Sequence, residues 1–229
     1  MRRVIAFSVL YACSSPLPPQ PWPAGSYCVL RDGERCPRAT NGEFEPGQIV
    51  IDTDNGMTLD GAHGSSRQLR DDDNDGLLSI EVCCGTFEDA GEAFPRESFV
   101  VLAGGTPGGA VSCPAGFTPG SVFVDAEDTE ALGDDAESHT TGIVGATTIT
   151  VQRNVDLIVC ESGPSLDGFE MPRANYCVFG GRGDSCPAGF ARGVMTTYDE
   201  ASGNTNELTG TVGGITQPGA STEFPVCCY

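Results

Sequence analysis

One pattern, repeated three times at intervals of roughly 70 to 77 residues, constrains this chain more than any single motif does. Each copy begins with an aromatic residue four positions after a proline, continues through a Cys-Pro pair and a glycine-led apolar run, and closes on Val-Cys. The Cys-Pro pairs start at Cys36, Cys113 and Cys186. Repeats set the architecture before any local motif is considered, so three copies of one small unit are expected.

The copies divide the chain into three segments joined by short polar connections. We assign residues 22–90 to repeat 1, 91–165 to repeat 2 and 166–229 to repeat 3. The expected arrangement is three tandem small disulfide-stapled β-rich modules, in which neighbouring copies touch. The alternative is one β domain with pseudo-threefold symmetry.

The cysteines of the three copies differ in an informative way. The outer copies have an extra cysteine after the early aromatic residue and a doubled cysteine at the end, whereas copy two has Val100 and Glu161 at these places. A disulfide predicts such paired loss, because a single leftover thiol is a liability in an oxidising compartment. The predicted disulfides are Cys36–Cys83, Cys113–Cys160 and Cys186–Cys227, with Cys28–Cys84 and Cys177–Cys228 added in the outer copies. Cysteine counting alone does not decide this, because four cysteines in one copy allow three pairings.

The N-terminal residues are typical of an export signal followed by a tether. Residues 1–12 have a basic start and a short apolar segment, as signal peptides do. The sequence Leu10-Tyr11-Ala12-Cys13 resembles a bacterial lipobox, which predicts lipidation of Cys13; the alternative is an ordinary signal peptide cleaved near Ala12. Residues 13–21 are proline-rich and predict a semi-rigid tether. We therefore expect an exported protein, lipid-anchored to the bacterial cell envelope at the outer membrane or the periplasmic or cell-surface face.

The charge of the chain excludes some partners. The formal net charge is −20, from 32 acidic and 12 basic side chains. Nucleic acids bind to clustered cations, so no nucleic-acid partner is expected. No stretch after the signal segment has the ~20 apolar residues that span a bilayer, so membrane contact is expected only through the lipid anchor.

Short alternating runs indicate strands throughout the copies. They are five to seven residues long and are bounded by glycine, proline, asparagine and aspartate, as strands are. The predicted strands are 48–52, 77–83, 121–125, 147–151 and 156–160. No window shows a sustained helical period, so the predicted fold class is all-β.

The first copy resembles the apextrin C-terminal domain, called ApeC. The resemblance rests on Trp22-Pro23-Ala24-Gly25-Ser26-Tyr27, Cys36-Pro37, Asp52-Thr53-Asp54-Asn55 and the closing Cys83. Copies two and three keep a Cys-Pro-Ala-Gly-Phe segment and later acids but lack the tryptophan. The resemblance covers about residues 22–229 and implies an extracellular recognition module, a type linked in animals to bacterial cell-wall material.

One loop has the composition of a calcium site. Asp71, Asp73 and Asp75 alternate before Gly76, as the ligands of calcium loops do. The twelfth position, which should be a bidentate glutamate, is Val82. The alternative is an Asp-Gly hairpin turn. Apart from a Ca²⁺ ion at this loop, no cofactor is expected.

Acidic residues recur after the same strand in each copy and are candidate ligand-binding groups. They are Asp52 and Asp54, Asp125 and Glu127, and Asp199 and Glu200. Their carboxylates could accept hydrogen bonds from sugar hydroxyls, or they could cap turns through their own backbone. Trp22 is a candidate for stacking on a sugar ring, with core packing as its alternative.

Two functional classes follow. The first is a surface-anchored, non-catalytic protein that recognises glycan or cell-envelope polymer through three ApeC-like repeats, with avidity among weak sites. The second is a structural or adhesion lipoprotein of the envelope with protein partners only. No enzymatic function is expected, because His63 and His139 lie in loops without a recognisable nucleophile motif.

Overall fold

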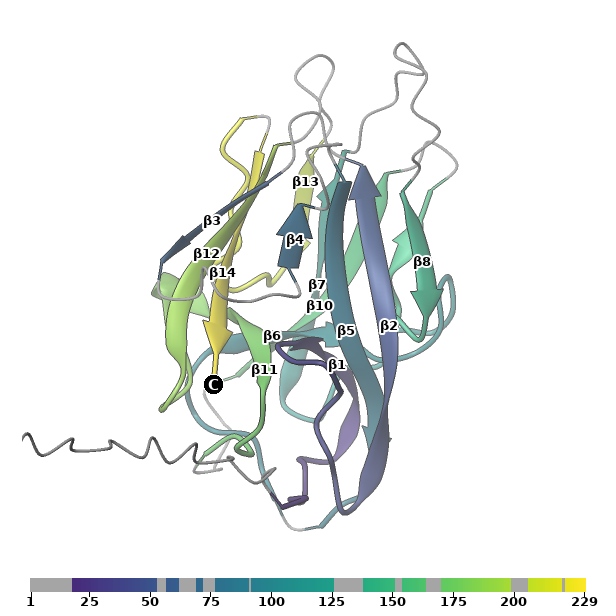
Figure 1. Ribbon diagram of the computed structural model, residues 1–229, viewed down its shortest axis with the longest axis vertical. Helices are drawn as coiled ribbons and strands as arrows, with labels where there is room; N and C mark the ends of the chain where they lie inside the picture. The colour runs from purple at the N-terminus through teal and green to yellow at the C-terminus, as the bar shows by residue number, and fades with distance from the viewer. Residues whose placement is uncertain are drawn as a thin grey trace, which may run out of the picture.

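The computed structural model shows a protein built from β-strands (Figure 1). The structure describes residues 18–52, 57–61, 69–71, 77–90, 92–125, 138–150, 154–163, 170–198, 206–219 and 221–229. Within them the strands are β1 (Gly25–Arg31), β2 (Gly42–Asp52), β3 (Met57–Gly61), β4 (Leu69–Asp71), β5 (Leu77–Phe87), β6 (Phe99–Ala103), β7 (Phe117–Val124), β8 (His139–Gly142), β9 (Thr148–Ile149), β10 (Val155–Ser162), β11 (Tyr176–Gly180), β12 (Ala191–Tyr198), β13 (Glu207–Gly210) and β14 (Ser221–Cys228), and a 3-10 turn, η2, covers Arg182–Asp184. The all-β prediction is confirmed.

Each copy contributes a three-stranded antiparallel unit. In copy one β5 lies between β1 and β2, in copy two β10 lies between β6 and β7, and in copy three β14 lies between β11 and β12. Four predicted strands, 48–52, 77–83, 121–125 and 156–160, fall on β2, β5, β7 and β10, which extend further than predicted. Of the fifth, 147–151, the described residues 147–150 form a strand at Thr148–Ile149, and residue 151 lies outside the described part of the chain.

The first strands of the three copies pair with one another at the centre of the molecule. Tyr27 of β1 lies opposite Ala103 of β6, Val100 of β6 opposite Phe179 of β11, and Cys177 of β11 opposite Leu30 of β1. The beginning of each strand therefore pairs with the end of another. The result is a closed cycle of three strand pairs that joins all the copies.

A second set of cross-copy pairs surrounds this centre. Strand β8 of copy two pairs with β2 of copy one, β13 of copy three with β7 of copy two, and β3 of copy one with β12 of copy three. All fourteen strands belong to one antiparallel sheet. This pairing corresponds to the alternative arrangement, one pseudo-threefold β domain, rather than to three separate modules, because each copy completes its sheet with a strand from another copy.

The central strands separate two hydrophobic cores. Cys28 and Leu30 of β1 face an aliphatic core that the long strands enclose, whereas Tyr27 and Val29 face an aromatic core on the other side. Both faces of these strands are buried, so their sequences lack the alternation of a half-buried strand. The criterion used on the sequence therefore does not identify β1, β6 and β11.

Five disulfides staple the sheet, and their pairing matches the pairing predicted from the sequence. Successive side chains of a strand point to opposite faces, so the doubled cysteines serve both cores. Cys84 bonds Cys28 on the aliphatic side, and Cys83 bonds Cys36 on the aromatic side. In copy two, Val100 lies directly opposite Glu161, where Cys28 and Cys84 lie opposite each other in copy one.

Glycines allow the crossing strands to approach closely. Gly142 of β8 and Gly210 of β13 both have φ +69°, in the left-handed region. A Cβ on Gly142 would lie 2.4 Å from the Pro46 carbonyl oxygen, and one on Gly210 would lie 2.7 Å from the Pro119 carbonyl oxygen. Glycine is therefore required at both crossings for conformation and for space.

Candidate functional site

Most of the acids predicted to bind ligands lie outside the described residues. These acids are Asp54, Glu127, Asp199 and Glu200. Asp73 and Asp75 of the predicted calcium loop and Cys13 of the predicted lipobox also lie outside the described residues. Asp52 ends β2 and Asp71 ends β4, and only their backbones are described. The calcium and lipidation hypotheses therefore remain predictions.

The strands that precede these acids all run toward the same end of the molecule (Figure 1). Strands β2, β7 and β12 occupy equivalent places in the three copies and end at one end of the molecule, uppermost in Figure 1. Asp125, which follows β7, is only 3% exposed, and its backbone N–H donates to Asn206 Oδ1 over 2.8 Å. The prediction that Asp125 offers an open carboxylate to a ligand is wrong, because burial places it in the packing of the domain.

The prediction that Trp22 stacks on a sugar is also wrong. Trp22 is 1% exposed, and its ring lies 4.6 Å from that of Phe44 and 4.8 Å from that of Tyr176, centroid to centroid. Asn41 fixes its backbone: Trp22 N–H donates to Asn41 Oδ1 over 2.8 Å, and Asn41 Nδ2 donates to the Trp22 carbonyl over 2.7 Å. The tryptophan thus anchors the aromatic core instead of facing solvent.

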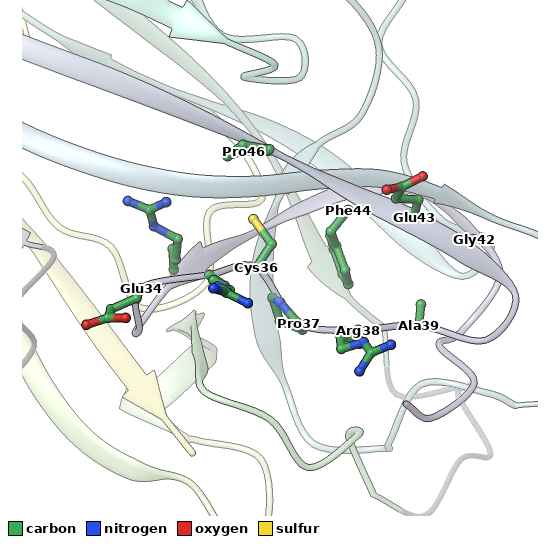
Figure 2. A pocket seen from close by; sticks show the side chains of 11 residues that line it. Glu34, Cys36, Pro37, Arg38, Ala39, Gly42, Glu43, Phe44 and Pro46 are labelled. Atoms are coloured by element: carbon green, nitrogen blue, oxygen red, sulfur yellow. The ribbon is translucent and has the colours of Figure 1, made fainter. Parts of the chain in front are cut away.

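An open pocket of about 490 Å³ lies in copy one, between the loop that follows β1 and the start of β2 (Figure 2). Its wall includes Cys36, which is bonded to Cys83, and its apolar surface includes Pro37 and Phe44. The remaining lining residues are Arg31, Glu34, Arg35, Arg38, Ala39, Gly42, Glu43 and Pro46. A concave surface that combines apolar groups with a few convergent polar groups is typical of ligand sites.

The three arginines of this pocket differ in their partners. Arg31 forms an ion pair with Glu81 of β5, and both side chains are largely buried. Arg35 and Arg38 are exposed. Within the described part of the chain, neither of these two forms an ion pair with a carboxylate. Two guanidinium groups are therefore available at the pocket, while the third is held in place.

The equivalent pocket in copy two has a different character. It has a volume of about 400 Å³ and is lined by Val111, Cys113, Pro119, Gly120, Ile158, Thr209 and Gly210. Pro119 lies opposite Cys160, as Pro46 lies opposite Cys83, which establishes the equivalence. No charged side chain lines it among the described residues. The same scaffold thus carries a charged pocket in one copy and an apolar pocket in another.

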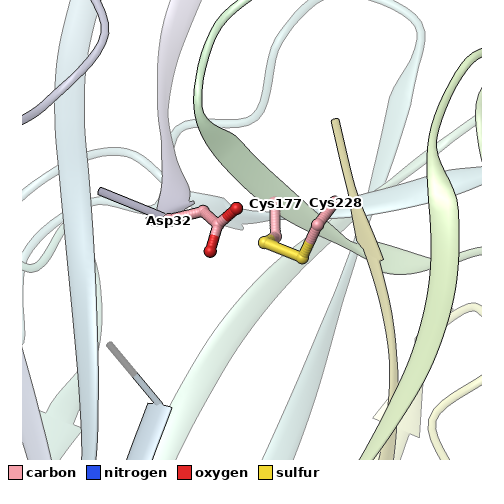
Figure 3. Close-up of side chains that lie close together, drawn as sticks. All are labelled: Asp32, Cys177 and Cys228. Carbon is pink, nitrogen blue, oxygen red and sulfur yellow. A yellow bond between two sulfur atoms is a disulfide. The ribbon is translucent and has the colours of Figure 1, made fainter. Parts of the chain in front are cut away.

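One carboxylate lies close to two sulfurs, but the group is no metal site. Asp32 lies beside Cys177 and Cys228 (Figure 3). These two sulfurs are bonded to each other, so neither is a thiolate that could bind a metal. The carboxylate therefore borders a structural disulfide.

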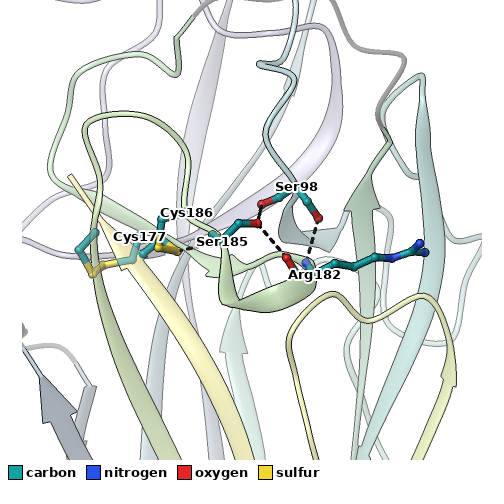
Figure 4. Close-up of a disulfide and its surroundings, with 7 residues drawn as sticks. Ser98, Cys177, Arg182, Ser185 and Cys186 are labelled. Atoms are coloured by element: carbon teal, nitrogen blue, oxygen red, sulfur yellow. Dashed lines mark hydrogen bonds between the residues drawn. A yellow bond between two sulfur atoms is a disulfide. The ribbon is translucent and has the colours of Figure 1, made fainter.

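A polar network replaces the missing disulfide of copy two. Glu161 is 4% exposed and pairs with Arg182, with 3.0 Å between Glu161 Oε1 and Arg182 Nε. The Arg182 N–H donates to Ser98 Oγ, and Ser185 Oγ donates to the Ser98 carbonyl (Figure 4). This network joins copy three to copy two by hydrogen bonds where a covalent bond is absent, so we assign it a structural role.

No protein-family model, curated protein or solved structure matches this chain. Among the described residues, no helix is long and apolar enough to cross a membrane. The five disulfides indicate folding in an oxidising compartment, which agrees with export.

The sequence reasoning missed the pocket arginines, although the sequence contains a signal for them. Arg35 precedes the first Cys-Pro pair, where the other copies have Ser112 and Ser185. Comparison of the copies position by position, rather than motif by motif, would have identified this difference.

Proposed function

We propose that this chain is an exported, non-catalytic binding protein that recognises a glycan or cell-envelope polymer. The observation that carries the proposal is the open pocket of about 490 Å³ in copy one, which combines exposed guanidinium groups, carboxylates and an apolar surface. Sugars are recognised by such combinations, because a pyranose ring presents hydroxyls at its edge and apolar C–H groups on its faces. The disulfide at Cys36 holds the pocket loop against β5, so little ordering is needed on binding.

The setting of this pocket on the cell follows from the proposed anchor. Lipidation of Cys13 and the proline-rich tether that follows would hold the domain just off a membrane face. The resemblance to the ApeC domain supports the same proposal, since it implies extracellular recognition. The lipid anchor is testable separately from the binding function, by mass analysis of the mature N-terminus.

A binding assay on immobilised polymers tests the function. The purified, oxidised mature chain is incubated with peptidoglycan and with a panel of insoluble polysaccharides, and bound protein is quantified over a concentration series. Saturable binding to at least one polymer is expected. Reduction and alkylation serve as the control and should abolish binding, because the pocket loop is held by Cys36–Cys83.

A protein-contact function is the second candidate, and one observation favours it. The copy-two pocket is apolar, and Val111 at its edge is 47% exposed. If the oxidised chain binds none of the polymers, the glycan proposal is rejected and protein contact through this surface becomes the better account. A Val111→Asp variant then tests it by loss of the partner captured from the envelope fraction.

A further inference from the structure

The copy-one pocket contains three arginines at positions that are small residues in the other copies. Arg31 ends β1, where the equivalent residues Ala103 and Gly180 end β6 and β11. The register fixes this equivalence, since the three residues lie opposite the aromatic residues that open copies three, one and two, respectively. The shared scaffold therefore does not require an arginine here.

The other two arginines show the same contrast around the Cys-Pro pair. Arg35 precedes Cys36, at the position of a serine in the other copies. Arg38 lies two residues after Cys36, where Ala115 and Ala188 follow the equivalent cysteines. All three arginines that distinguish copy one at these positions line a single pocket. Arg31 has a structural partner in Glu81. The shared strands do not require Arg35 and Arg38, because the other copies form the same strands without them.

The charge of the whole molecule makes this cluster more informative. A chain with a net charge of −20 repels anions in general. Exposed charges beyond about 8 Å are largely screened at physiological ionic strength, so the local pair of guanidinium groups decides what binds in the pocket. A dense polyanion would meet the repulsion of the remaining surface. The ligand that fits best carries isolated negative charges.

The arrangement along the pocket indicates what surrounds that charge. Glu34 and Glu43 lie at opposite ends of the pocket, and Cys36, Pro37 and Arg38 lie between them (Figure 2). Guanidinium groups donate paired hydrogen bonds to oxyanions, whereas carboxylates accept hydrogen bonds from hydroxyls. An acidic sugar between two neutral sugars presents this sequence of groups.

We infer that the copy-one pocket binds an oligosaccharide unit carrying a single oxyanion, a carboxylate or a sulfate, which Arg35 and Arg38 hold. This inference rests on the proposed glycan-binding function and specifies its ligand. Arg31 is a positioning residue: its ion pair with Glu81 fixes the wall of the pocket at the end of β1.

Calorimetric titration with three matched trisaccharides tests the inference. The probes are three trisaccharides of galactose that differ only in the central ring, which carries a carboxylate, a sulfate or no charge. The variants Arg35→Ser and Arg38→Ala introduce the residues found in the other copies, so both are expected to fold. Arg173→Ala is the matched control, since it removes one exposed arginine whose surface partner, Glu170, lies 3.6 Å away.

The wild-type chain should bind one or both acidic probes more tightly than the neutral probe, and the acidic probe bound more tightly identifies the anion. Arg38→Ala should lower the affinity for that probe by about tenfold or more, while Arg38→Lys restores part of it and Arg173→Ala leaves it unchanged. Equal binding of all three probes that survives both pocket substitutions would overturn the inference and leave the glycan function standing. Absence of binding to these probes and to every polymer of the immobilised panel rejects both.

Discussion

At the residue scale, burial separates the aromatic side chains from the binding surface. Tyr27 and Tyr176, which open copies one and three, are fully buried in the aromatic core. Burial raises the pKa of both phenols well above the usual tyrosine value of about 10. Tyr27 donates its hydroxyl to the Pro23 carbonyl over 3.0 Å. The Tyr176 hydroxyl is buried and has no hydrogen-bond partner within the described part of the chain. Both tyrosines therefore belong to the aromatic core and are not exposed to contact a ligand.

The raised pKa values predict a loss of stability in alkali. Above about pH 10 the unfolded chain ionises its tyrosines while the folded chain keeps Tyr27 and Tyr176 protonated, so the free energy of unfolding falls as pH rises. The slope approaches about 1.4 kcal/mol per pH unit for each tyrosine. Tyr176→Phe should reduce this slope and cost little at neutral pH. Denaturant unfolding from pH 8 to pH 11 measures it, and an unchanged slope in the variant would contradict the assignment.

The site of the missing disulfide offers a second test at this scale. Val100→Cys with Glu161→Cys places cysteines at directly opposite positions, as Cys28 and Cys84 are. A disulfide closing a loop of this length stabilises by up to about 4 kcal/mol in the chain-entropy model, less the contribution of the lost Glu161–Arg182 pair. The melting temperature should therefore rise. Val100→Cys with Glu161→Ser is the control, and peptide mapping that finds no 100–161 bond would refute the equivalence.

At the element scale, the crossing strands depend on glycine more than on side-chain packing. Each crossing strand is short, and β8 and β13 are mostly exposed. Their backbones lie close to the neighbouring copy because Gly142 and Gly210 lack side chains. The joints between copies are thus set by backbone geometry.

Substitution of one such glycine should open a joint. Gly142→Ala combines a left-handed conformation with a 2.4 Å contact to the Pro46 carbonyl oxygen, so a loss of about 3 kcal/mol or more in the free energy of unfolding is expected. Gly219 has the same φ of +69° but open space around its Cβ position. Gly219→Ala should therefore cost only about 1 to 2 kcal/mol. Equal losses in the two variants, measured by denaturant unfolding, would show that the close contact is unimportant.

The sequence predicts some elements and not others for physical reasons. Strands β2, β5, β7 and β10 are visible because their apolar runs stand between clusters of turn-forming residues. The disulfide pattern is visible because paired loss in copy two leaves a trace in the sequence. The central strands and the crossing partners are not, since burial on two faces removes alternation and no residue type specifies which copy a strand joins.

At the scale of the whole molecule, the cyclic pairing predicts one cooperative unit. If the copies unfolded independently, calorimetry would resolve several transitions. Because every copy shares hydrogen bonds with both others, we expect a single transition whose calorimetric and van't Hoff enthalpies agree. Residues 22–90 expressed alone should remain largely unfolded even when oxidised, since β2 then lacks β8 and β3 lacks β12. A folded, soluble copy one would contradict this prediction.

The residues of the candidate site could be predicted only in part from the sequence. The acids and Trp22 stand out as residue types, but exposure decides whether a side chain can meet a ligand, and exposure depends on the assembled copies. Arg35 and Arg38 carry no motif, and their meaning appears only when the three copies are superimposed on one scaffold.

The disulfides of this fold join residues of the same copy, whereas the cross-copy strand pairs join residues that lie far apart in the sequence. Every disulfide closes within one copy, over 41 to 56 residues. One of the surrounding cross-copy pairs, β3 with β12, joins Leu59 of copy one to Met195 of copy three. During synthesis or translocation from the N-terminus, copy one can therefore oxidise early, but its β3 waits for β12 to emerge. A ribosome that stalls late, or a truncation before β12, yields a chain with correct disulfides in its first two copies and an exposed sheet edge, which is the form that quality-control proteases and aggregation act on.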